Sequence, residues 1–168
     1  MEEPTLEILA VDYDMIMFKH CFPISNIQED DTISDVNYEK KTLGNYKLQY
    51  IALKEKLYEF PQTKFIIWTG AALVEKSTSP EEAGRAREFA SWVSNVWDEP
   101  NDNVYIFDFR QIETNGDLYM KSNYSVSVWD SHPNPEFSQK AAQLLVNRLI
   151  DIIMNDGVKT TLAGEYIL

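Results

Sequence analysis

Short apolar runs and longer amphipathic segments alternate along the chain. The apolar runs cover Tyr13–Phe22 (YDMIMFKHCF), Lys64–Gly70 (KFIIWTG) and Asn103–Phe109 (NVYIFDF). Each run has the length of a strand, and nearly continuous apolar character is typical of strands that are covered on both faces. We therefore predict three strands, with Tyr13–Phe22 and Lys64–Gly70 buried in a parallel sheet.

An amphipathic helix is predicted between the first two strands, from about Leu43 to Phe60. The apolar side chains that recur there at three- and four-residue spacing are Tyr46, Tyr50, Leu53 and Leu57. This is the period of a helix that buries one face, and Pro61 marks its end.

Two further helices carry start signals. Ser79 precedes a proline and stands three residues before Glu82, the arrangement of a capping box, so a helix is predicted from there to about Trp97. Asn134, also followed by a proline, is the expected N-cap of a final helix that runs to about Met154. The only residues before the first strand, MEEPTLEILAV, resemble the tail of a helix.

Strands that alternate with helices indicate βαβ units, in which the sheet is parallel and both of its faces are covered. We therefore predict an α/β fold, a three-layer α/β/α sandwich with a parallel sheet, formed by residues 1–168 as a single domain. Ligands of such sheets bind beyond the carboxyl ends of the strands, which here are the loops that begin at His20, Gly70 and Phe109. The polar segment Ile24–Lys40 shows no regular period and is long for a connection, so we expect it to line a site.

Charge and composition exclude several classes of function. Fifteen basic and twenty-seven acidic residues give a formal net charge of −12, and no basic run is present that could follow a phosphate backbone, so nucleic acid is not an expected partner. The longest strongly apolar run, Phe65–Val74, is too short to span a membrane. The acidic N-terminus differs from a secretory signal, and a single cysteine, Cys21, excludes an internal disulfide. We expect a cytoplasmic protein, unless a signal peptide has been lost with a missing N-terminus.

The candidate chemistry lies in WDSHPNPEF, Trp129–Phe137. A carboxylate that binds one imidazole nitrogen fixes the tautomer and makes the other nitrogen a better base, so Asp130 and His132 are candidates for an orienting acid and a general base. The alternative interpretation is structural: Pro133 restricts His132 to an extended backbone, and Asp130 forms local turn hydrogen bonds.

Several stretches resemble the SGNH hydrolases, also called GDSL-like lipases or esterases. DSHPN before a terminal helix is similar to the last conserved block of that family, FKHCFPISNI to its third block, and IIWTGAALV with PEEAGRAREFASWV to the strand and helix that follow. VYIFDF is similar to the last strand. The resemblance implies a flavodoxin-like sandwich and hydrolysis of an acyl ester, a lipid or an acetylated carbohydrate. It also implies that His132 is the base, Asp130 its orienting acid and Asn26 an oxyanion donor.

The sequence departs from the family in two respects. The family spacing is Asp-x-x-His, whereas this chain has Asp-Ser-His, and the family's Gly-Asp-Ser-like nucleophile block is absent. The resemblance begins at what should be the third strand of five, so the first two strands are expected to be missing. The first strand of this chain would then present an open edge. Either another chain covers this edge, for example in a homodimer, or the sequence is truncated.

No residue of the chain clearly replaces the family serine. Cys21 follows the first strand and is a candidate thiolate, although a lone cysteine is more often a small buried hydrophobic residue. Ser25 and Ser131 carry hydroxyls in the expected neighbourhood, but neither stands on a strained strand-to-helix turn. Asn26 is interpreted either as an oxyanion donor or as a turn asparagine that bonds its own backbone.

The remaining candidates have structural alternatives. Gly70 either lets backbone approach a ligand or ends a strand, and Trp129 is a candidate for stacking on a sugar. Trp92 and Trp97 are expected in the core, and His20 is interpreted as a loop histidine. Two distant histidines give no metal-ligand spacing, so no metal or other cofactor is expected. Two hypotheses follow: an SGNH-like ester hydrolase that lacks its serine, or a non-catalytic remnant that binds a ligand or associates with itself.

Overall fold

A three-stranded parallel sheet forms the centre of the protein. The computed structural model describes residues 5–31 and 34–167. The strands are β1 (Met15–Lys19), β2 (Lys64–Trp68) and β3 (Val104–Phe107), hydrogen-bonded in the order β1-β2-β3. Both pairings are parallel, with Met17 opposite Ile66 and Ile67 opposite Ile106. The predicted α/β class and parallel sheet are confirmed.

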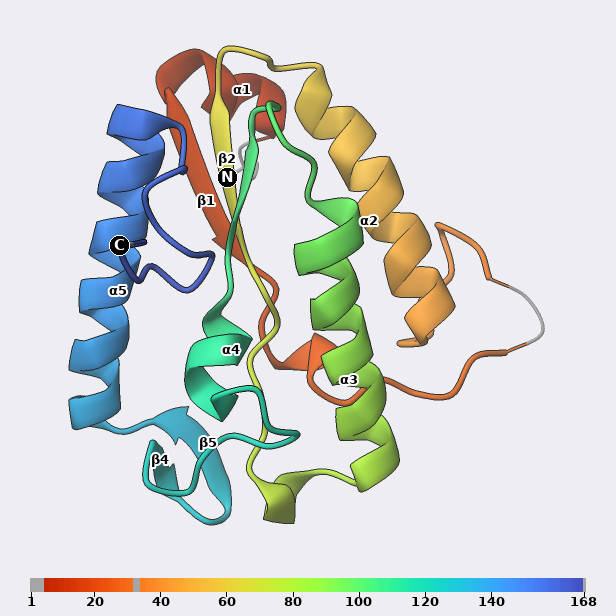
Figure 1. The fold of residues 1–168 in the computed structure, drawn as a ribbon. Coiled ribbons are helices and arrows are strands. Elements are labelled where there is room, and N and C mark those ends of the chain that lie inside the picture. Colours follow the sequence, from red (N-terminus) through yellow and green to blue (C-terminus); the bar gives the residue numbers. More distant parts are fainter. Residues whose placement is uncertain (1–4, 32–33, 168) are drawn as a thin grey trace.

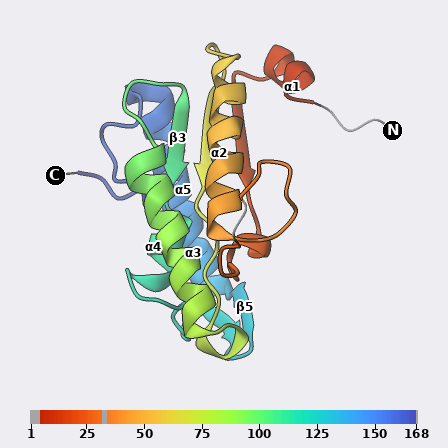
Figure 2. The same ribbon diagram turned by 90° about the vertical axis from the view of Figure 1, so that its right-hand side faces the viewer.

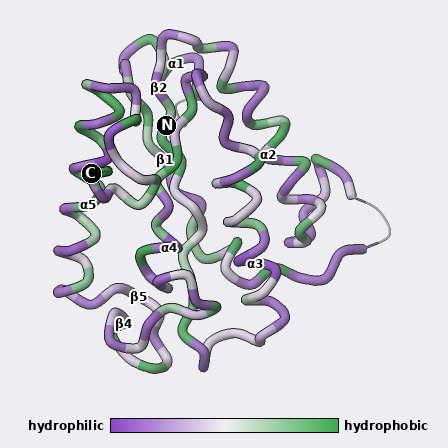
Figure 3. The backbone as a smooth tube through the Cα atoms, in the orientation of Figure 1, coloured by the Kyte–Doolittle hydropathy of each residue, from purple (hydrophilic) through white to green (hydrophobic). Residues whose placement is uncertain are grey.

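Helices lie on both faces of this sheet (Figures 1 and 2). The two helices α2 (Leu43–Tyr58) and α3 (Pro80–Trp92) are on one face, and α5 (Pro135–Asn155) is on the other. Side chains of β2 alternate between the two cores: Phe65 and Ile67 pack with α2 and α3, whereas Ile66 packs with residues of α5. Hydrophobic residues are concentrated along β1 and β2 in the middle of the molecule (Figure 3).

The predicted helix starts agree with the structure. The Ser79 hydroxyl accepts a hydrogen bond from the Glu82 backbone N–H, and the Glu82 carboxylate accepts one from the Ser79 backbone N–H, so the capping box is confirmed. The Asn134 side chain accepts from the Phe137 backbone N–H at 2.9 Å and thereby caps α5. Helix α3 ends at Trp92, five residues earlier than predicted, because the chain continues as one π-helical turn, Val93–Trp97.

Strand β1 differs from the prediction. It spans Met15–Lys19 rather than Tyr13–Phe22, and its side chains are only partly buried. Met17 is 44% exposed, on the same side of the strand as Met15, which packs partly against the core near α5. The strand lies at the edge of the sheet, as predicted, but the expected burial on both faces was wrong, because an apolar run does not reveal how far helices will cover its strand. The segment before β1 is a short helix, α1 (Leu6–Asp12), as MEEPTLEILAV suggested.

Two elements near the candidate site were not predicted. The third strand ends at Phe107, and a short helix, α4 (Phe109–Thr114), begins two residues later with Asp108 as its N-cap. The segment before α5, for which no strand was predicted, forms an antiparallel hairpin of β4 (Ser125–Ser127) and β5 (Asp130–Pro133). The segment Ile24–Lys40 contains little regular structure, as predicted, and Thr32 and Ile33 in it lie outside the described residues.

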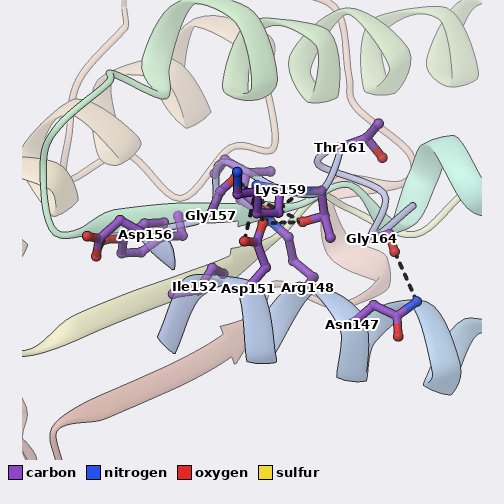
Figure 4. Close-up of polar contacts among 12 residues, drawn as sticks. Asn147, Arg148, Asp151, Ile152, Asp156, Gly157, Lys159, Thr161 and Gly164 are labelled. Carbon is purple, nitrogen blue, oxygen red and sulfur yellow. Dashed lines mark hydrogen bonds and ion pairs between the residues drawn. The ribbon is translucent and has the colours of Figure 1, made fainter. Parts of the chain in front are cut away.

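The chain after α5 folds back and is fixed by a buried polar cluster (Figure 4). The Asp151 carboxylate accepts hydrogen bonds from the backbone N–H groups of Lys159 and Thr160, at 2.9 and 2.7 Å. Arg148 donates to the backbone oxygens of Ile106 and Gly157. These contacts join the C-terminal loop to α5 and β3.

Candidate functional site

The hairpin β4–β5 carries the two candidate catalytic residues. It lies at the carboxyl end of the parallel sheet, next to the start of α5 (Figure 1). Along β5 the Ser131 side chain is buried, whereas the Asp130 and His132 side chains are 45% and 69% exposed. Since successive side chains of a strand point to opposite faces, the spacing of two residues places Asp130 and His132 on the same face of the hairpin.

Asp130 and His132 form a close pair. Asp130 Oδ1 lies 2.6 Å from His132 Nδ1 and also accepts the backbone N–H of His132 at 3.0 Å. The backbone hydrogen bond, followed by the imidazole contact, lowers the pKa of the Asp130 carboxyl below its usual value, so the group is a carboxylate at neutral pH. A carboxylate at Nδ1 favours the tautomer with the proton on that nitrogen, which leaves the lone pair on Nε2. The pair therefore has the arrangement of a base and its orienting acid.

Phe22 links this pair to the strand ends. Its ring meets the His132 ring edge to face, with 5.2 Å between centroids. Phe22 belongs to a short 3-10 turn, Phe22–Ile24, that follows β1. His132 therefore stands near the chain as it leaves the carboxyl end of β1, where ligands of parallel sheets bind.

The two candidate serines both serve to hold one loop. This loop, Thr69–Val74, follows β2. The Ser25 hydroxyl donates to the Ala71 backbone oxygen at 2.5 Å, and the Ser131 hydroxyl accepts from the Val74 backbone N–H at 3.0 Å. Both serines are nearly inaccessible, with 1% and 6% of their surface exposed. Neither is placed as a nucleophile, and among residues 5–31 and 34–167 no hydroxyl or thiol hydrogen-bonds to Nε2 of His132.

Asn26 and Gly70 are brought to the same region as these serines. The Asn26 side-chain oxygen accepts a hydrogen bond from the Thr78 hydroxyl at 2.5 Å. This orients the amide and leaves its N–H₂ group for another acceptor. A Cβ on Gly70 would lie 2.5 Å from Ile24 Cδ1, so the glycine allows the loop after β2 to pack closely against the turn after β1. The observed role of Gly70 is therefore packing.

The other candidates are dispersed. Trp129 is at the hairpin turn and is 69% exposed, so no neighbouring ring forms a stacking partner within the described chain. Cys21, which directly precedes the 3-10 turn Phe22–Ile24, is exposed, which corrects the interpretation of this residue as a small buried hydrophobic side chain. His20 packs against the rings of Tyr46 and Tyr50, and burial lowers the pKa of its imidazole. Trp97 is buried, as predicted for a core residue.

Two buried ionisable side chains on α4 were not identified from the sequence. Glu113 is 0% exposed, and its Oε2 accepts the Ala72 backbone N–H at 2.7 Å. Arg110 is 4% exposed and donates to the backbone oxygens of Ala71 and Leu118. Both side chains therefore hold the same loop, Thr69–Val74, as the serines do. Charged residues three apart on a short helix look like an ordinary solvated face, so no sequence signal distinguishes them.

Comparisons with known proteins do not assign the chain to a family. No family model, no curated protein and no solved structure matches it. The fold and the site together define an α/β protein with an Asp–His pair beside the carboxyl end of a parallel sheet. In the part of the chain that the structure describes, no helix is sufficiently long and apolar to cross a membrane.

Proposed function

We propose that this chain is the Asp–His-bearing portion of an SGNH-like ester hydrolase, in which β1, β2 and β3 correspond to the last three strands of a flavodoxin-like sheet. The observation that carries the proposal is the 2.6 Å contact of Asp130 Oδ1 with His132 Nδ1, on a strand that leads directly into the final helix. The substrate class is an acyl ester, including lipid and acetylated carbohydrate esters.

In the proposed mechanism, His132 Nε2 takes the proton of a nucleophilic hydroxyl as that hydroxyl attacks the ester carbonyl carbon. Asp130 stabilises the imidazolium that forms. The Asn26 amide N–H₂, which its oxygen contact with Thr78 orients, is suited to donate to the developing oxyanion. His132 then returns the proton to the leaving alcohol, and a water molecule activated by the same base hydrolyses the acyl intermediate.

The mechanism requires a nucleophile, and the two candidate serines, Ser25 and Ser131, are engaged with the loop after β2. We therefore propose that the nucleophile reaches His132 from a polypeptide segment outside this chain. By itself, the chain is expected to hydrolyse activated esters slowly, with the exposed imidazole as the reactive group.

Two measurements test the role of the pair. With p-nitrophenyl acetate, His132→Ala should lose at least about tenfold of any hydrolysis above buffer, since general bases contribute about 10²–10⁴. Lys140→Ala, on the exposed face of α5, is the control and should not change the rate. With diethyl pyrocarbonate at pH 8, mass spectrometry should show that Asp130→Asn slows modification of His132 and leaves His20 unaffected. Equal modification of His132 in both proteins would show that Asp130 does not activate it.

The second candidate function is self-association. Within the described residues β1 pairs with β2 alone, so the outer edge of β1 presents unpaired backbone groups beside the exposed Met17. A second copy of the chain can add an antiparallel strand there about a two-fold axis, giving one continuous sheet. In this role the protein is a non-catalytic module, and Asp130 and His132 are present but catalyse no reaction.

A further inference from the structure

A second site lies beside the hairpin and does not include the Asp130–His132 pair. It is a cavity of about 470 Å³, with walls from the turn after Val74, from the segment 117–122 that follows α4, and from Val128 at the hairpin turn. Cavities of about 300–1,000 Å³ are typical of small-molecule sites. Neither Asp130 nor His132 lines it.

Hydrogen bonds between the walls hold this cavity open. Ser131 joins β5 to Val74 at 3.0 Å, and the Ser77 hydroxyl donates to the Trp129 backbone oxygen at 3.1 Å. The Met120 backbone N–H donates to the Leu73 oxygen at 2.9 Å, which joins the third wall to the first. A cavity whose walls are tied together in this way is formed before a ligand arrives, and that reduces the ordering cost of binding.

The lining divides into an apolar floor and a charged rim. Val74 and Met120, each 3% exposed, form the floor together with Leu118, and Val128 stands at the exposed lip. These side chains are aliphatic or thioether groups, which suit an alkyl chain. The rim carries the carboxylates of Glu75 and Asp117 and the ammonium groups of Lys76 and Lys121. Lys121 is paired with Asp117, and Glu75 forms no ion pair with Lys76 among the described residues.

The other ammonium group, on Lys76, remains for a ligand. Among the described residues, no carboxylate forms an ion pair with Lys76. An apolar floor below an unpaired cation fits a molecule with an alkyl tail and an anionic head.

We propose that this cavity binds a medium-length fatty acid or a similar acyl carboxylate, with the alkyl chain on Val74, Leu118 and Met120 and the carboxylate beside Lys76. The site is independent of the proposed ester hydrolysis, because Ser131 points towards the loop that bears Val74 whereas His132 is on the opposite face of β5. The hairpin is nevertheless shared, so a bound ligand would also fix the strand that carries Asp130 and His132.

Calorimetric titration with hexanoate, octanoate and decanoate tests the proposal on the whole chain. Affinity should rise by about fourfold for each added CH₂ group that enters the cavity. Leu118→Trp, which fills the cavity, should weaken octanoate at least about tenfold, as expected when two or more methylenes are kept out. Val126→Trp, on the exposed side of the hairpin, is the matched control and should bind as the wild type does.

Two further variants test the contact with the carboxylate head group and the independence of this cavity from the Asp130–His132 pair. Lys76→Gln should weaken the binding of octanoate by about twofold to fivefold, because one exposed ion pair is lost. The binding of 1-octanol, which has no carboxylate, should be unchanged. His132→Ala should bind octanoate normally even if the proposed hydrolysis fails. If Leu118→Trp does not fold, Val128→Glu at the exposed lip should weaken octanoate by repulsion. Absence of binding, or affinity that is independent of chain length and of these substitutions, would overturn the proposal.

Discussion

The hydroxyl of Ser131 accepts a hydrogen bond from the backbone N–H of Val74, 3.0 Å away and out of contact with solvent. This bond fastens the strand that carries His132 to the loop after β2. Ser131 was a candidate nucleophile by position, and the contact assigns it a structural role instead.

Ser131→Ala should therefore lower the unfolding free energy of the protein, because Ser131 has a structural role and is not the nucleophile. It leaves the buried Val74 N–H unpaired, which costs about 1–3 kcal/mol of unfolding free energy. Urea unfolding measures the loss. Ser138→Ala, at an exposed position of α5, should change the value by less than about 0.5 kcal/mol. A Ser131→Ala protein as stable as the wild type would contradict the hydrogen bond.

Gly70→Ala should also be destabilising, for a reason of shape. The added methyl would lie 2.5 Å from Ile24 Cδ1, and overpacking of this kind costs about 1–3 kcal/mol. Ile24 Cγ1 would lie 2.6 Å away, and Ile24→Ala removes both atoms, so the double variant Gly70→Ala/Ile24→Ala should lose less stability than the sum of the two single variants. Gly84→Ala is the control, because a Cβ there meets no atom within 4 Å, and in helix α3 it should stabilise by about 0.5–1 kcal/mol. Additive losses in the double variant would argue against the Ile24 contact.

Self-association through β1 is tested by placing a charge at the centre of the open edge. Met17→Lys should convert a dimer to a monomer, since a lysine there opposes its own copy across the two-fold axis. Ile150→Lys, at a 48% exposed position on the outer side of α5, should leave the dimer intact. Sedimentation velocity at several concentrations distinguishes the two states. A wild-type protein that is monomeric throughout would remove the edge-pairing candidate.

Local signals predicted the elements that depend on local chemistry. Ser79 and Asn134 begin their helices as expected, because a cap is set by residues within one turn. Asp130 and His132 were selected by their chemistry, and the strand period then places both on one face of β5, although that strand itself was not predicted. The functional role of the pair stays a prediction.

The features that could not be predicted from the sequence depend on contacts between residues that are far apart in the chain. Met15–Lys19 reads as a strand buried on both faces, and only the tertiary arrangement leaves Met17 44% exposed. Ser25 and Glu113 meet the loop after β2 from segments 46 and 41 residues away, so neither spacing nor propensity could indicate their role. Cys21 is likewise exposed although it lies in an apolar run, because the run alone does not show which of its residues the tertiary structure covers.

Glu113 makes the stability of the fold depend on pH. Burial raises the pKa of its carboxyl from 4.5 to about 8, and the Ala72 N–H and the charges of Arg110 and Lys19 only partly offset this effect. At pH values between 4.5 and about 8, the Glu113 carboxyl is deprotonated in the unfolded chain and still protonated in the folded protein. The folded state then binds more protons than the unfolded state, so the Glu113 contribution to stability falls as pH rises from about 4.5 to about 8, and it levels off above that.

Glu113→Gln should remove this dependence while keeping the hydrogen bond from Ala72, because an amide oxygen accepts as a neutral carboxyl does. The unfolding free energy of the variant, relative to the wild type, should increase by up to about 1 kcal/mol per pH unit between pH 5 and 8. Urea unfolding at pH 5, 6.5, 8 and 9 measures the difference, and the exposed Glu136→Gln variant corrects for the loss of one charge. A difference that is constant from pH 5 to 8 would show that Glu113 ionises in the folded protein as it does in the unfolded chain, and that its buried environment is more polar than the contacts with Ala72 and Arg110 indicate.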